Sequence, residues 1–131
     1  MGGFFGSVKK GSAVFDTFIG TDYHSHLGTK RGGMAAFDGE LGLQREIHNI
    51  ENAPFRTKFE RTLQEMRGNA AIGCISDTDP QPLLMVSKLG KYAISTVGVI
   101  NNAAELMAEV LSKGGYFDAM TGSKVNSNEL I

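Results

Sequence analysis

One histidine-containing segment has the residue types of a metal site. Asp22, His24 and His26 are similar in composition to the two-histidine, one-carboxylate sets that bind transition metals. They fall in a segment whose apolar spacing predicts a helix, and helical residues at i and i+2 point to different faces. We therefore interpret them as surface polar residues, and the sequence predicts no metal site.

Two other polar segments lack the spacing that ligand binding requires. Asp77 and Asp79 resemble the start of a calcium loop, but Pro80 and the missing later glutamate exclude an EF-hand. We interpret them as an acidic turn. The glycine-rich run 27–33 lacks the spacing of a phosphate-binding P-loop, so we interpret it as a turn with a solvated basic pair.

Cys74 is the only cysteine, so an internal disulfide is impossible and a reducing cytoplasm is the expected compartment. It lies in a run of small apolar residues. We interpret its thiol as buried, and the alternative is a displaced catalytic nucleophile.

The elements that would position these residues begin with strands and one helix. The sequence predicts a strand at 4–8, a helix at 13–27, and strands at 33–37 and 41–48. Gly20 weakens the helix prediction. The last two strands flank Asp38-Gly39, a favoured hairpin turn.

The second half opens with the clearest helical pattern in the chain. Phe55, Phe59, Leu63 and Met66 form a single apolar stripe, with charged residues on the other face. Pro54 stands at or just before the first turn and Gly68 just beyond the end.

Further elements follow at 69–76, 83–87 and 92–100, which we predict as strands. Asn102 and Glu105 have capping-box spacing at the start of another helix, and Gly114 ends it. Residues 129–131 resemble the opening turn of a helix. The pattern predicts a layered α+β domain with largely antiparallel sheets, and the 17 glycines suit its many tight turns.

Composition narrows the classes of function. The chain has 131 residues and a net charge of −1, which argues against nucleic-acid binding because nucleic-acid binders normally carry a basic face. No apolar run approaches the roughly 18 residues needed to span a bilayer, so no membrane partner is expected.

Five segments, in order, carry a resemblance to a known family. They are Gly2-Gly3-Phe4-Phe5-Gly6, Lys30-Arg31-Gly32 with Met34-Ala35, Arg67-Gly68-Asn69-Ala70-Ala71-Ile72-Gly73, Gln81-Pro82, and Asn102-Ala103-Ala104-Glu105-Leu106. Together they resemble class II glutamine amidotransferases, and the amidophosphoribosyltransferase glutaminase domain most of all. The resemblance implies an αββα sandwich of the N-terminal-nucleophile hydrolase type. Residues 1–131 would form the front part of that domain, with no phosphoribosyltransferase domain and no cofactor.

The family's chemistry requires an N-terminal cysteine as nucleophile and a free α-amine as local base. In this chain the nucleophile position matches Gly2, which has no side chain. Removal of Met1 would expose an α-amine, but a base without a nucleophile has no function here.

The family's other site positions are also altered. The oxyanion region matches Thr96, Val97 and Gly98, with no asparagine before the glycine. The arginine that would hold the substrate carboxylate becomes Ser76, and the aspartate that would hold its amino group becomes Ser127. Asp77 lies beside Ser76 and would repel a carboxylate. Arg31 and Gly32 match the family's site wall.

These differences predict a domain that is inactive as a glutaminase and acts by binding or assembly. The expected partner is a second copy of the chain or a separate phosphoribosyltransferase chain. The alternative is an active amidotransferase component that delivers ammonia to such a phosphoribosyltransferase.

Overall fold

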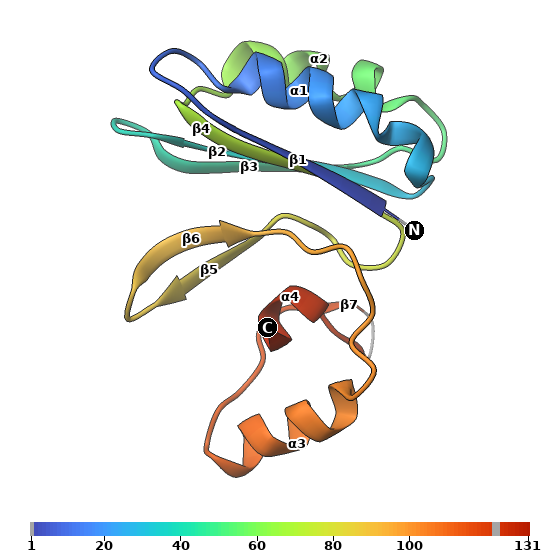
Figure 1. Cartoon of the computed structure of the whole chain (residues 1–131), viewed down its shortest axis with the longest axis vertical. Helices are drawn as coiled ribbons and strands as arrows, with labels where there is room; N and C mark the ends of the chain where they lie inside the picture. Colours follow the sequence, from blue (N-terminus) through green and yellow to red (C-terminus); the bar gives the residue numbers. More distant parts are fainter. Residues whose placement is uncertain (1, 122–123) are drawn as a thin grey trace.

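The computed structural model describes residues 2–121 and 124–131, and its largest element is a four-stranded antiparallel sheet (Figure 1). Its strands are β1 (Gly2–Val8), β2 (Arg31–Asp38), β3 (Gly42–Asn49) and β4 (Ala70–Ser76). They lie in the order β1-β4-β2-β3, so β4 separates the chain's first strand from the β2–β3 hairpin. Met1, on which the expected α-amine depends, is outside the described residues.

Two helices cover one face of this sheet, α1 (Val14–Tyr23) and α2 (Phe55–Glu65) (Figure 1). A short 3-10 turn, η1 (Ser25–Leu27), follows α1, so the predicted helix 13–27 is divided in two. Gly20 is nevertheless part of α1, and its missing side chain leaves room for the ring of Phe5, which a β-carbon there would overlap.

The predicted apolar stripe of α2 is confirmed. Phe55, Phe59 and Met66 are buried in the core between the helices and the sheet, and Leu63 packs against them. Phe55 and Phe59 stack with ring centroids 4.2 Å apart. At the side of this stripe, Arg56 of α2 pairs with Asp22 of α1 at 2.7 Å and joins the two helices.

The β2–β3 hairpin is confirmed, but its turn is wider than predicted. Asp38 is the last residue of β2, and its carboxylate accepts the backbone N–H groups of Glu40 and Leu41. The side chain of Asp38 thereby organises a loop of three residues between the strands in place of a two-residue turn.

A second layer lies on the other face of the large sheet (Figure 1). It contains the antiparallel hairpin of β5 (Leu83–Ser87) and β6 (Gly90–Ile94). Helix α3 (Ala103–Ser112) lies beyond this hairpin. The chain ends with the small hairpin β7 (Met120–Thr121) and β8 (Lys124–Val125), followed by α4 (Ser127–Leu130). The layers therefore run helix, sheet, sheet, helix, which confirms the predicted αββα arrangement.

Two local predictions in this layer are wrong. The strand predicted at 92–100 ends at Ile94, and residues 95–100 form a loop. The predicted capping box is absent, because the Asn102 side chain makes no cap hydrogen bond to any described residue. The apolar face of α3, which contains Leu106, Met107, Val110 and Leu111, is only partly covered, since no described residue of that helix is buried. Gly114 does end the helix, with a positive φ of 81°.

Candidate functional site

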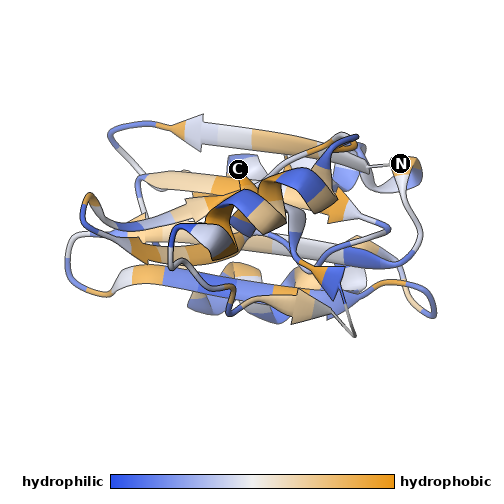
Figure 2. Ribbon diagram, turned by 90° about the horizontal axis from the view of Figure 1, so that it is seen from below, coloured by the Kyte–Doolittle hydropathy of each residue, from blue (hydrophilic) through white to orange (hydrophobic). Residues whose placement is uncertain are grey.

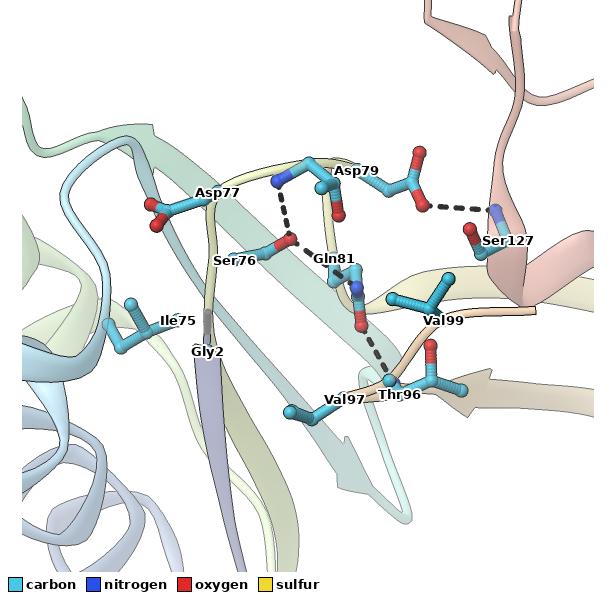
Figure 3. Close-up of a pocket in the computed structure, with 12 residues that line it drawn as sticks. Gly2, Ile75, Ser76, Asp77, Asp79, Gln81, Thr96, Val97, Val99 and Ser127 are labelled. Atoms are coloured by element: carbon cyan, nitrogen blue, oxygen red, sulfur yellow. Dashed lines mark hydrogen bonds between the residues drawn. The ribbon is translucent and has the colours of Figure 1, made fainter. Parts of the chain in front are cut away.

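A cavity of about 280 Å³ opens where β1 begins and β4 ends (Figure 3). The loop after β4 forms one wall, the loop 95–100 forms another, and the start of α4 closes a third side. The lining residues are Gly2, Ile75, Ser76, Asp77, Thr78, Asp79, Gln81, Thr96, Val97, Gly98, Val99 and Ser127. The cavity thus collects residues that lie far apart in the sequence.

Gln81 is the buried side chain that connects two of these walls. Its amide oxygen accepts the backbone N–H of Thr96 at 2.7 Å, and its amide nitrogen donates to the Ser76 hydroxyl at 3.4 Å (Figure 3). Gln81 therefore fixes the loop 95–100 against the end of β4.

The two acidic residues of the cavity are engaged with backbone. The Asp77 carboxylate accepts the N–H groups of Thr29 at 2.7 Å and Lys30 at 3.1 Å, which lowers the pKa of that carboxyl. Asp79 is buried and accepts the N–H of Ser127 at 3.1 Å. Both carboxylates therefore hold neighbouring loops in place, a role the sequence did not indicate.

Most of the site residues suggested by the sequence lie at this cavity. Those lining it are Gly2, Ser76, Asp77, Thr96, Val97, Gly98 and Ser127. Asp79, which the sequence placed with Asp77 in an acidic turn, also lines it, and the lining residues that were not indicated as site positions are Ile75, Thr78, Gln81 and Val99. Of these, Gln81 could have been found from the sequence, because the Gln81-Pro82 pair is one of the five segments that resemble the family.

Arg31 and Gly32 are the two suggested positions that do not line the cavity. Arg31 lies beside Ser76 across the sheet, but its guanidinium donates to the Thr78 carbonyl at 2.8 Å and is exposed. Gly32 faces the helices, where an added β-carbon would lie 2.6 Å from the ring of Phe55. Neighbouring strand residues point to opposite faces, so Gly33, beside Gln81, lies on the side of the second layer instead.

Cys74 is buried as predicted, with 1% of its surface exposed. It lies between Phe4 and Gly33 in the sheet register and does not line the cavity. Burial raises the pKa of its thiol to about 11, so the reactive thiolate is scarce at neutral pH.

The raised pKa of Cys74 predicts a specific pH dependence of stability. Above about pH 9 an unfolded chain loses the thiol proton while the folded chain keeps it, so folding weakens as pH rises toward 11. The loss is at most about 2–3 kcal/mol. Urea unfolding should give a lower free energy of unfolding at about pH 10.5 than at pH 7.5. The part of that decrease caused by Cys74 should be present in the wild-type chain and absent from Cys74→Ala. Equal pH dependence in the two proteins would contradict the assignment.

The residues considered for a metal site are engaged elsewhere. Asp22 pairs with Arg56, and Nδ1 of His24 and of His26 lie at 2.7 and 2.9 Å from carbonyl oxygens of their own helical segment. Among the residues the structure describes, no three His, Cys, Asp or Glu side chains are placed to hold a metal ion. No helix in this part of the chain is long and apolar enough to cross a membrane.

Two antiparallel sheets between helical layers, with the first strand leading from a cavity, define the N-terminal-nucleophile hydrolase type of fold. Solved structures of that fold resemble the chain. One is a glutamine phosphoribosylpyrophosphate amidotransferase from B. subtilis complexed with ADP and GMP, at 25% identity and a TM-score of 0.72 over 94% of this chain. Another is described as the allosteric regulatory enzyme of purine biosynthesis, at 25% identity and a TM-score of 0.73 over 91% of this chain.

The chain spans about 27% of the length of each of these proteins. No protein-family model matches the chain, and no curated protein matches it. The structural neighbours therefore support the fold of an amidophosphoribosyltransferase glutamine domain.

Proposed function

We propose that this chain is a glutaminase-like domain of the amidophosphoribosyltransferase type that does not hydrolyse glutamine and acts by binding or assembly. The observation that carries the proposal is the position of Gly2 at the cavity, where the resemblance places the family's nucleophile. Glycine has no side-chain atom that can attack an amide carbon. A role beside a phosphoribosyltransferase chain in purine biosynthesis is part of the proposal and rests on the named neighbours.

The nearest alternative nucleophiles in the cavity are hydroxyl groups. The Ser76 hydroxyl accepts hydrogen bonds from the Thr78 backbone and the Gln81 amide, and neither group is a base that could remove its proton. Cys74 is outside the cavity and its thiol is protonated at neutral pH. These contacts favour a pocket that binds without reacting.

The backbone around Gly2 also supports this proposal. A β-carbon at Gly2 would overlap the carbonyl oxygen of Ile75 on the neighbouring strand. A cysteine introduced there would have to shift the strand before its thiol reached the cavity. The site therefore differs from a glutaminase active site in the space around Gly2 as well as in the absence of a thiol.

The test is glutamate release from glutamine, since an active glutaminase would exceed the uncatalysed rate by about 10⁶-fold or more. We expect the wild-type chain to remain at the uncatalysed rate. Gly2→Cys should also remain there, equal to its matched control Gly2→Ala, which adds the same β-carbon without a thiol.

Two outcomes would contradict the proposal. Wild-type activity that disappears in Cys74→Ala would identify a displaced nucleophile and an active amidotransferase component. Activity in Gly2→Cys above Gly2→Ala would show that the remaining pocket is functional.

A further inference from the structure

The outer edge of β1 is open. No described strand pairs with it, and β1 runs along the outer margin of the molecule (Figure 2). The strand Gly2–Val8 contains no charged residue and no proline. Natural proteins normally protect a free edge with such residues, because its unpaired N–H and C=O groups can recruit another strand.

Apolar side chains flank this edge on the helix side. Phe15, Ile19 and Tyr23 lie at i, i+4 and i+8 of α1, form one stripe, and are all exposed, with 76% of Tyr23 accessible. With Phe5 of β1 they line a cavity of about 420 Å³. This surface continues from the edge of the strand up the side of the helix.

Apolar side chains also flank the edge on the opposite side of the sheet. Gly3 and Phe5 face the helices, so Phe4 and Val8 point the other way, and they are 61% and 82% exposed. Both faces of the same free edge are therefore apolar, an arrangement that marks interaction sites.

The sequence of β1 is complementary to itself in one register. Antiparallel pairing of two copies about Phe5 places Phe4 opposite Gly6 of the second copy, and Val8 opposite Gly2 of the second copy. Phe4 and Val8 then each lie beside a glycine on the same face, and the two Phe5 side chains meet at the two-fold axis on the helix face. Even-numbered residues pair with even-numbered ones, so both pairs of helices remain on one side of an eight-stranded sheet.

The apolar area is of the size that a dimer needs. Aromatic side chains bury roughly 150–250 Å² each, so the exposed residues at this edge offer on the order of 1,000 Å² across two copies. With the paired backbones this approaches the lower bound of about 1,200 Å² for specific interfaces. Lys9, just beyond the strand, forms an ion pair with Asp16 of its own chain, which offsets its charge.

We propose that the chain forms a two-fold symmetric dimer in which β1 pairs antiparallel with β1 of a second copy, centred on Phe5. The pairing joins the two large sheets and places the two α1 stripes side by side. It requires no activity at the cavity, so it stands independently of the proposed function.

The first experiment is sedimentation of the wild-type chain at concentrations on the order of 10–100 µM. We expect a dimer, and Val8→Lys should weaken it at least about tenfold because a charge would enter the paired edge. Leu89→Lys is the matched control, since Leu89 is equally exposed in the β5–β6 turn, away from β1. A monomeric wild-type chain would overturn the proposal. The free edge of β1 would then be a binding site for a strand of a different protein. A dimer that Val8→Lys does not weaken also overturns the proposal.

The second experiment tests the register. In Phe5→Cys, the two introduced cysteines would face each other across the axis, within the roughly 4.4–6.8 Å Cα separation that a disulfide allows. We expect a disulfide-linked dimer on mild oxidation. In Ser7→Cys, on the same face, the two cysteines would be offset by about four residues, roughly 13 Å, and should not link. Linkage of Ser7→Cys in place of Phe5→Cys would overturn the proposed pairing.

Discussion

Truncation of Phe59 to alanine is expected to lower the free energy of unfolding by about 3–5 kcal/mol. Phe59 is 0% exposed, stacks on Phe55, and meets the ring of His48 edge-on at 4.8 Å. Its removal would leave a void that rigid neighbours on both α2 and β3 cannot close. The loss is a large fraction of the roughly 5–15 kcal/mol that holds a typical domain folded.

Urea unfolding followed by far-UV circular dichroism measures this effect. The matched control is Phe37→Ala, because Phe37 is also a phenylalanine of this part of the fold, in strand β2 of the sheet that α2 covers, but it is 49% exposed and its truncation should cost about 1 kcal/mol. A Phe59→Ala penalty no larger than that of Phe37→Ala would contradict the assignment of the core to the helix side of the sheet.

The second large effect is expected from Gly33→Ala. A β-carbon at Gly33 would overlap the carbonyl oxygen of Gln81 and crowd the ring of Pro82 at 2.8 Å. Relief requires the loop after β4 to move away from the sheet, at a cost of about 1–3 kcal/mol or more. That movement would also displace the Gln81 amide from the Thr96 N–H.

Two measurements separate these consequences. Urea unfolding reports the lost stability, and hydrogen exchange should show the Thr96 amide exchanging faster in Gly33→Ala. Gly39→Ala is the control, because nothing lies within 4 Å of a β-carbon there and its effect should stay within about 0.5 kcal/mol. If Gly33→Ala matches Gly39→Ala in both measurements, the contact between β2 and the cavity loop is not as close as described.

The acidic turn after β4 shows how the sequence can indicate a residue at the cavity without indicating the contacts that the residue makes. Asp77 was expected to repel a bound carboxylate, and it does lie at the cavity. Its carboxylate is nevertheless occupied by the backbone N–H groups of Thr29 and Lys30. The sequence separation between these residues and Asp77 is nearly fifty positions, so no local pattern could reveal the contact.

The sequence by itself determined the elements whose pattern is local. The stripe of Phe55, Phe59 and Met66 specifies α2 because residues three to four apart share one helical face, and burial of that stripe followed. The strand from Phe4 to Val8 was similarly evident from a short apolar run next to glycines, and the β2–β3 hairpin from its turn residues. The motif order also anticipated the αββα layers.

Tertiary structure alone decided which face each strand residue presents and which strands are neighbours. Nothing in Gly32-Gly33 reveals that the first glycine faces Phe55 and the second faces Gln81, because two adjacent glycines fit either register. Residues 95–100 are apolar enough for a strand, yet Gln81 holds Thr96 and the segment becomes the cavity wall. Strand pairing depends on contacts between distant residues, and it is this pairing that places β4 beside β1 and leaves the outer edge of β1 open among the described residues.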